Sequence, residues 1–122
     1  MPHDPNRPTV HIAPRQGWLN DPHGLIRWNG RTHLFFQSNP TSAAWGPPAW
    51  AHMVSDDLMH WTQLHAALTP AMPPADDAGC WTGSIVPVNG EPWLYYSAAR
   101  NVPSAPRLQA IGLARPLDED LV

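Results

Sequence analysis

The sequence predicts an all-β protein built from a repeated four-stranded antiparallel unit, the kind that forms the blades of a β-propeller. Charged residues make up only 14% of the chain and there are 16 prolines, which disfavours helices and favours short strands joined by irregular loops. Asn-Gly pairs at 29–30 and 89–90, each between strand-like runs, are a strong local signal for β-hairpins. Their spacing of 60 positions indicates an internal repeat.

The repeat extends beyond the turns. The run Met-Val-Ser-Asp-Asp-Leu at 53–58 is echoed, about one period later, by an acidic run that ends at Leu121. A four-stranded unit that cannot bury both faces alone is typical of a propeller blade, so we expect one blade and most of a second. A small β-sandwich made from the same hairpins is the alternative, against which the repeat argues.

The elements are expected in the following order. Residues 1–9 are polar and proline-rich and predict a loose lead-in to one partial propeller domain over 10–122, beginning with an edge segment at 10–14. The first blade, about 24–66, has predicted strands at 25–28, 32–36, 50–55 and 61–66, and the second, about 81–122, has them at 84–88, 92–97 and 108–114. Proline-rich loops are expected at 38–48, 69–79 and 101–106.

One stretch near the N-terminus carries candidate chemistry. Residues 17–24 read Gly-Trp-Leu-Asn-Asp-Pro-His-Gly, and the strand predicted at 25–28 follows at once. Pro22 biases Asp21 towards an extended backbone and Gly24 permits a turn, so we expect a stiff, sharply turned segment that aims a carboxylate into a cleft. From these residues alone, an ordinary turn that begins a strand is the simpler interpretation.

Composition excludes several classes of function. A net charge of −3 with seven Lys and Arg leaves no basic patch for nucleic acid. No apolar run could span a membrane and the N-terminus has no apolar signal region, so a cytoplasmic location is expected, with secretion as the alternative. Cys80 is expected to be a buried thiol, and the seven histidines show no zinc spacing, so no metal is predicted.

Four stretches, taken together, resemble glycoside hydrolase family 32, the invertases, levanases and inulinases. The stretch at 18–24 resembles the family signature Trp-Met-Asn-Asp-Pro-Asn-Gly. Leu-Phe-Phe-Gln-Ser-Asn-Pro at 34–40, the run from Trp50 to Trp61, and Trp-Thr-Gly-Ser at 81–84 follow in the family's order and at similar spacing. The resemblance covers about residues 8–121, and it implies a five-bladed β-propeller, usually followed by a β-sandwich.

The resemblance also implies an activity and a set of site residues. In this family the Asp of Asn-Asp-Pro is the nucleophile of a retaining hydrolase that cleaves β-D-fructofuranosides, which would make Asp21 the nucleophile here. The substrate-binding positions that match are Trp18, Leu19, Asn20, Asp21, Gln37, Trp45, Trp81 and Thr82. Without the resemblance, the tryptophans are more simply core residues between blades, and Gln37 a cap on a strand edge. No cofactor is implied, and the partner is a fructose-containing oligo- or polysaccharide.

Two features depart from the family pattern. His23 stands where the family commonly has Asn, and Trp81-Thr82 replaces Phe-Ser while keeping the hydroxyl. The Arg-Asp-Pro motif and the Glu-Cys motif of the general acid/base are absent from the sequence, and Glu91 and Glu119 are more simply solvated charges.

These absences set the expected behaviour of the chain. We expect it to be the N-terminal part of such an enzyme, inactive alone and prone to self-associate through exposed blade edges. The alternatives are a non-catalytic carbohydrate-binding fragment and, more distantly, a propeller glycosidase acting on arabinan. Sucrose, phosphorylated sucrose, levan and inulin all remain open as substrates.

Overall fold

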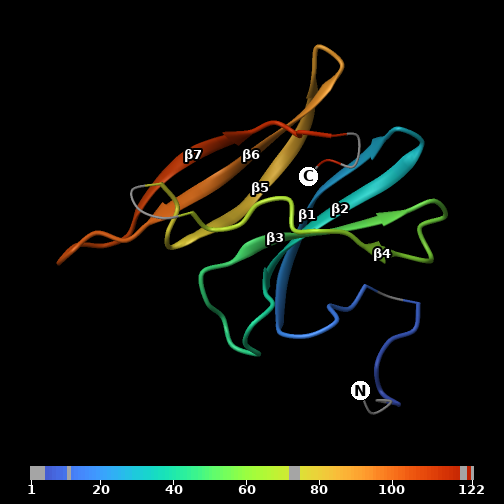
Figure 1. Cartoon of the computed structure of the whole chain (residues 1–122), viewed down its shortest axis with the longest axis horizontal. Coiled ribbons are helices and arrows are strands. Elements are labelled where there is room, and N and C mark those ends of the chain that lie inside the picture. Colours follow the sequence, from blue (N-terminus) through green and yellow to red (C-terminus); the bar gives the residue numbers. More distant parts are fainter. Residues whose placement is uncertain (1–4, 11, 72–74, 119–120, 122) are drawn as a thin grey trace.

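The computed structural model describes residues 5–10, 12–71, 75–118 and 121 as two antiparallel sheets (Figure 1). The first sheet has the order β1-β2-β3-β4 and the second the order β5-β6-β7. Their bounds are β1 Trp18–Trp28, β2 Arg31–Asn39, β3 Ala49–Ser55, β4 Thr62–Gln63, β5 Gly79–Val88, β6 Glu91–Arg100 and β7 Leu108–Ala114. The all-β fold predicted from composition is confirmed.

Both Asn-Gly turns close two-residue hairpins as predicted. Asn29 and Gly30 have φ of 46° and 78°, and Asn89 and Gly90 have φ of 51° and 81°. Positive φ at both central residues is the type I′ geometry, whose twist matches that of the strands it joins. Trp28 pairs with Arg31 in the first hairpin and Val88 pairs with Glu91 in the second, so both turns fix the same register.

The repeat is visible in the three-dimensional arrangement. Strands β1, β2 and β3 have counterparts in β5, β6 and β7 about 60 residues later. The echo between the Asp-Leu runs extends to the backbone, because Leu58 and Leu121 both have positive φ, of 66° and 62°. Strands β1 and β5 pack against each other, so the two sheets meet along their first strands (Figure 1).

Four predicted elements differ from the structure. The strand expected at 84–88 begins at Gly79, as β5. The strand expected at 25–28 begins at Trp18, because β1 continues to pair with β2 through the Asn-Asp-Pro stretch. No strand forms at residues 10 and 12–14, the described part of the expected edge segment, where Arg7 instead donates hydrogen bonds to the carbonyls of Ala13 and Pro14. The strand expected at 61–66 is reduced to β4.

The main hydrophobic core lies between the sheets. Trp50, which is fully buried, packs there with Phe35 of the first sheet and with Cys80, Ile85 and Leu94 of the second, and Leu121 closes the cluster. A second cluster of Phe36, Ala51 and Met53, on the other face of the first sheet, is covered by Ile12, Leu19 and Trp61. Both faces of the first sheet are therefore covered.

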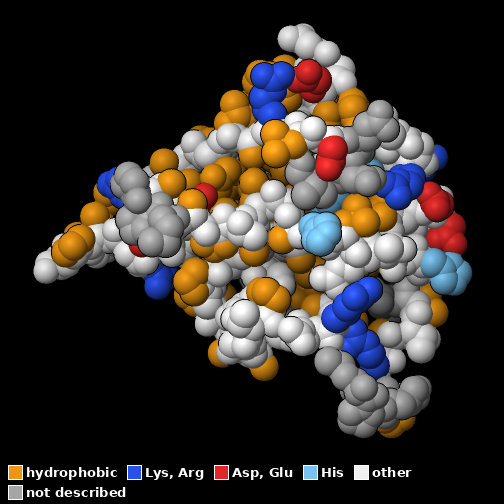
Figure 2. All heavy atoms as spheres, in the orientation of Figure 1, with side chains coloured by type: hydrophobic (Ala, Val, Ile, Leu, Met, Phe, Trp, Pro, Cys, Tyr) orange, Lys and Arg blue, Asp and Glu red, His pale blue; other side chains and the backbone are white. Residues whose placement is uncertain are grey.

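The second sheet has one covered face and one exposed face. Register places Val86, Trp93, Tyr95, Ile111 and Leu113 together on the face turned away from the core. Ile111 is 84% exposed and Leu113 is 51% exposed. Figure 2 shows apolar side chains spread across the visible surface, with most charged side chains towards its margins. We call the set of Val86, Trp93, Tyr95, Ile111 and Leu113 the outer face of the second sheet.

Candidate active site

Asp21 lies inside β1, at a bulge rather than at a turn before the strand. The pairing of β1 with β2 is regular up to Asn20 and resumes at Pro22, so Asp21 is the extra residue. The extended backbone expected for Asp21 before Pro22 is wrong, because its φ of 48° lies in the left-handed region, which Asp tolerates better than most residues. Side chains of neighbouring residues face opposite ways along a regular strand. Because the bulge interrupts this alternation, the side chains of Asn20 and Asp21 both line the same cavity.

The second sheet has the same irregularity at the matching position. In β5 the pairing with β6 slips between Trp81 and Gly83, which makes Thr82 the extra residue. Thr82 is 61 positions after Asp21, one repeat period later. Gly83 is required there because a Cβ atom would lie 1.9 Å from the carbonyl oxygen of Tyr95. Two matching bulges therefore face each other across the junction of the sheets.

A chain of hydrogen bonds links the two bulges. The Trp18 indole donates to Asn20 Oδ1 at 2.8 Å, and Asn20 Nδ2 donates to Gln37 Oε1 at 3.1 Å. Gln37 Nε2 donates to Thr82 Oγ1 at 2.6 Å, and Thr82 Oγ1 donates to Asp21 Oδ2 at 2.8 Å. An indole can only donate and a carboxylate can only accept. The hydrogen bonds of this series therefore all run in one direction, from the Trp18 indole to the Asp21 carboxylate. Such an ordered series stabilises negative charge at its end.

These groups line an open cavity of about 410 Å³ at the junction of the two sheets. The lining residues are Asn20, Asp21, Gln37, Trp45, Trp81, Thr82 and Ser97. The rings of Trp45 and Trp81 meet edge to face at a centroid distance of 6.4 Å, and the guanidinium of Arg107 lies 5.2 Å from the centre of the Trp45 ring. A carboxylate, two amides, two hydroxyls and two indoles can hydrogen-bond the hydroxyls of a sugar and stack on its C–H face.

Two residues of the expected substrate-binding set lie outside this lining. Trp18 is partly exposed and reaches the cavity through its hydrogen bond to Asn20. Leu19 packs on the other side of the strand, in the cluster of Phe36, Ala51 and Met53, because neighbouring strand residues face opposite ways. The structure therefore gives Leu19 a packing contact rather than a place in the cavity wall.

Ser97 lines the cavity and was not predicted from the sequence. It pairs with Trp81 across β5 and β6. The signal that identifies it is the repeat, because Ser97 lies 60 positions after Gln37, the residue at the same place in β2. Gln37 and Ser97 therefore line the cavity from equivalent positions in the two repeats.

His23 supports the backbone behind the carboxylate. Its Nδ1 is 2.7 Å from the carbonyl oxygen of Asp21, which requires a proton on Nδ1, and its ring meets Trp50 edge-on at 4.2 Å. Burial lowers the pKa of His23, and the hydrogen bond to Asp21 and the Asp21 charge partly oppose this effect. A neutral imidazole with its proton on Nδ1 fits the position, because Nε2 is buried and has no hydrogen-bond partner among the described residues.

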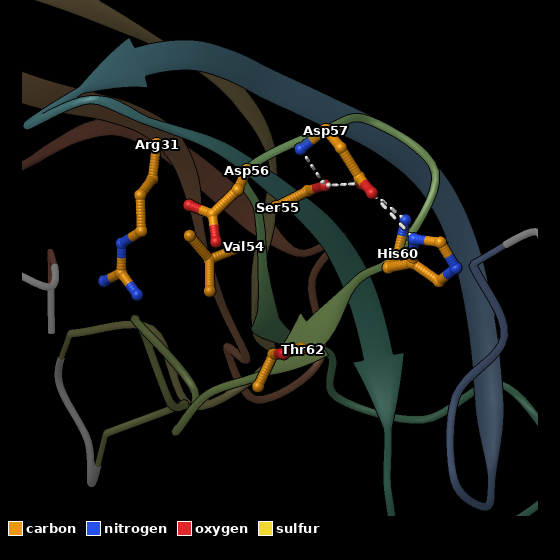
Figure 3. Close-up of a pocket in the computed structure, with 7 residues that line it drawn as sticks. All are labelled: Arg31, Val54, Ser55, Asp56, Asp57, His60 and Thr62. Carbon is orange, nitrogen blue, oxygen red and sulfur yellow. Dashed lines mark hydrogen bonds and ion pairs between the residues drawn. The ribbon is translucent and has the colours of Figure 1, made fainter.

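A second hollow, on the first sheet, has a different character (Figure 3). Its lining includes Asp57 and His60 in the turn after β3. Asp57 accepts hydrogen bonds from the backbone of Met59 and His60 and from the His60 ring, at 2.7 to 2.9 Å. These bonds, the one from the His60 side chain first, hold the pKa of Asp57 well below its usual range. The carboxylate is thus engaged in closing the turn.

Neither a metal cluster nor a membrane-spanning helix is found in the described part of the chain. No three of its His, Cys, Asp and Glu side chains gather closely enough to hold a metal ion. Within the same residues there is no helix of the length and apolarity needed to cross a bilayer.

The paired sheets and the cavity at their junction define the chain as part of a β-propeller protein. The sequence matches the glycosyl hydrolases family 32 N-terminal domain over residues 11–120. The chain therefore belongs to glycoside hydrolase family 32, in which this domain is a five-bladed propeller, as the sequence resemblance implied.

Individual relatives agree with this assignment. A cell wall β-fructofuranosidase of Pisum sativum is 40% identical over 98% of this chain and 21% of its own length. Sucrose-6-phosphate hydrolase of Escherichia coli is 47% identical over 74% of this chain and 19% of its own length. The chain spans about a fifth of the length of these curated relatives.

Solved structures give the same result. Sucrose-6-phosphate hydrolase of Lactobacillus gasseri superposes with a TM-score of 0.81 at 36% identity, covering 88% of this chain and 22% of that one. A variant of fructan 1-exohydrolase IIa from Cichorium intybus, in complex with 1-kestose, gives a TM-score of 0.82 at 34% identity, covering 94% of this chain and 22% of that one.

Proposed function

We propose that this chain is the nucleophile-bearing part of a retaining β-fructofuranosidase. The observation that supports this most is the hydrogen bond of 2.8 Å from Thr82 Oγ1 to Asp21 Oδ2, made across two sheets at the wall of the cavity. It fixes the carboxylate and leaves Oδ1 as the attacking oxygen. Relatives at 40% and 47% identity named as a β-fructofuranosidase and a sucrose-6-phosphate hydrolase support the same substrate class.

The reaction proceeds in two steps. Asp21 Oδ1 forms a bond to the anomeric carbon of a terminal fructofuranosyl unit, while the bond from that carbon to the leaving oxygen breaks and that oxygen takes a proton from a general acid. Water then attacks the same carbon and loses a proton to the same group, now acting as base, which releases fructose and restores Asp21. The indoles of Trp45 and Trp81 and the amides of Asn20 and Gln37 hold the sugar.

The second carboxyl group comes from outside the residues described here. Asp21 is the only carboxylate among the described residues that line the cavity. Glu91 lies at the hairpin tip of the second sheet, where it pairs with Arg115, and Glu119 lies outside the described residues. We therefore propose that the 122-residue chain alone hydrolyses fructosides negligibly, because loss of the general acid costs about 100- to 10,000-fold.

The decisive experiment separates binding from turnover. The purified chain is titrated with sucrose and 1-kestose, with maltose as a sugar that lacks fructose, while the indole N–H signals of Trp45 and Trp81 are followed by NMR. We expect the fructosides to shift both signals in the wild type, a weaker response to maltose, and no release of fructose. Binding of maltose equal to that of sucrose contradicts the fructoside assignment, and rapid sucrose hydrolysis contradicts the missing general acid.

A non-catalytic carbohydrate-binding fragment is the second candidate, favoured by the single carboxylate in the cavity. The mass of the native gene product separates the two functions. A mass several times 13.5 kDa supports the hydrolase, and a mass near 13.5 kDa supports the binding fragment. The cytoplasmic location stays a prediction, which cell fractionation tests.

A further inference from the structure

A buried carboxyl group lies behind the cavity wall. Asp76, just before β5, is 4% exposed. It accepts hydrogen bonds from the Ala71 N–H at 2.7 Å, the Tyr96 hydroxyl at 2.8 Å and the Cys80 thiol at 3.4 Å. A buried carboxyl group is costly unless such donors surround it, and all three partners donate. Asp76 therefore joins the loop at Ala71 to β5 and β6.

Both side-chain partners of Asp76 are sequence neighbours of cavity residues. Cys80 precedes Trp81 in β5, and Tyr96 precedes Ser97 in β6. Neighbouring strand residues face opposite ways, so Asp76 holds the core side of the two strands whose other side forms the cavity wall. Burial first, and then Asp76, raises the pKa of both Cys80 and Tyr96, which keeps them protonated as donors.

Residues of β3 and the loop before it bond to the same segment. The Trp50 indole donates to the carbonyl of Trp81 at 2.9 Å, and the Cys80 N–H donates to the carbonyl of Pro48 at 2.8 Å. The Trp81 indole donates in turn to the carbonyl of Ala78 at 3.2 Å, within the turn that Asp76 begins. Residues 80–82 are thus held both by Asp76 and by residues of the first sheet.

We propose that Asp76 is a positioning residue of the sugar site: through Tyr96 and Cys80 it fixes where Trp81, Thr82 and Ser97 stand in the cavity. The proposal rests on the proposed function for its ligand. It gives a role to a buried carboxyl group that takes no part in the chemistry assigned to Asp21.

Asp76→Asn is the direct test, with Asp77→Asn as its matched control. An amide at position 76 presents one oxygen and one NH₂ group where three donors now meet, so at least one of the three bonds is lost or reversed in direction. Asp77 is the adjacent carboxylate, and it bonds instead to the backbone and side chain of Asn101, at 3.2 Å and 3.0 Å. Tyr96→Phe removes a single donor and serves as the milder second variant.

Two quantities are measured on the full chain. The first is the NMR chemical shift of the Trp81 indole N–H, and the second is the dissociation constant of the chain for 1-kestose. We expect Asp76→Asn to move the indole signal and weaken binding about three- to tenfold, the effect of one lost hydrogen bond. Asp77→Asn leaves both unchanged. Because the Tyr96 hydroxyl acts through its bond to Asp76, the effects of Asp76→Asn and Tyr96→Phe on binding should not add in the double variant.

The outcomes separate positioning from simple stabilisation. A folded Asp76→Asn chain with a lower melting temperature, but an unchanged Trp81 signal and unchanged affinity, overturns the proposal. If Asp76→Asn does not fold, the Trp81 signal and the affinity for 1-kestose are measured in Tyr96→Phe instead, and unchanged values there overturn the proposal. If the wild type binds no 1-kestose, the proposed function fails, and the Trp81 signal alone, compared between the variants at positions 76 and 77, still decides the role of Asp76.

Discussion

The Thr82 hydroxyl accepts a hydrogen bond from Gln37 and donates one to Asp21, so it joins the amides of the first sheet to the carboxylate. Thr82→Val keeps the shape of the side chain but leaves both partners without this contact. We expect it to lower the free energy of unfolding by about 0.5–1.5 kcal/mol per lost bond and to weaken binding of 1-kestose. Urea unfolding and an NMR titration measure the two effects. Thr82→Ser keeps the hydroxyl and is the control; equal losses in both variants would show that the methyl group matters rather than the hydrogen bond.

His23 gives the fold a pH dependence at the acid side of neutrality. Burial lowers its pKa in the folded chain, so as the pH falls below about 6.5 the unfolded chain takes up the proton first and stability is lost. Above that pH the imidazole is neutral in both states and contributes no slope. We expect His23→Asn to reduce the loss of stability between pH 7 and pH 5, by at most about 1.4 kcal/mol per pH unit for one proton. Denaturant unfolding at several pH values checks this, and identical slopes in both proteins would contradict it.

At the scale of the strands, two glycines that lie in or beside strands carry different constraints. Gly30 has φ of 78° and open space where a Cβ atom would be, whereas at Gly83 a Cβ atom would lie 1.9 Å from the carbonyl oxygen of Tyr95. We expect Gly30→Ala to cost about 1–2 kcal/mol, the strain of a left-handed residue, and to leave the hairpin intact. We expect Gly83→Ala to separate β5 from β6 locally and to abolish the Thr82 contact. Thermal unfolding and amide exchange distinguish the two, and a mild effect at Gly83 would contradict the close approach.

The strands that local pattern predicts are those with regular alternation. The strand-like runs at 32–36, 50–55, 92–97 and 108–114 lie within β2, β3, β6 and β7. The first seven residues of β1 escape prediction because Asp21 and Pro22 look locally like a turn, whereas pairing with β2 continues on both sides of the bulge at Asp21. Strand β4 is shorter than predicted because only Thr62 and Gln63 pair regularly with β3.

The residues of the site could be predicted from the sequence only in part, because local motifs identify residues but not the contacts between strands. The resemblance indicated Asn20, Asp21, Gln37, Trp45, Trp81 and Thr82, all of which line the cavity. The contact between Thr82 and Asp21 depends on β1 packing against β5, which no local pattern specifies. Asp76 escaped notice because its partners come from two strands and a loop, and in the sequence it is one of two adjacent acidic residues.

At the scale of the whole molecule, the outer face of the second sheet governs behaviour in solution. The repeat relates Val86 and Tyr95 on this face to Ile26 and Phe35, which the second sheet covers in the first unit. Because Ile111 and Leu113 are exposed there, we expect the chain alone to self-associate. Sedimentation should show concentration-dependent oligomers that Ile111→Lys suppresses. Leu117→Lys, which changes an apolar side chain that is 94% exposed but outside the strands, should leave them in place. A monodisperse wild-type monomer would contradict the expectation.

The matching bulges at Asp21 and Thr82 place one backbone irregularity at equivalent positions of both repeats. It presents an acid in the first repeat and an alcohol in the second, and the two side chains meet at 2.8 Å. The contact belongs to neither copy alone. A substitution at either position therefore alters the surroundings of the residue one period away, so the two repeats form a single functional unit at this contact.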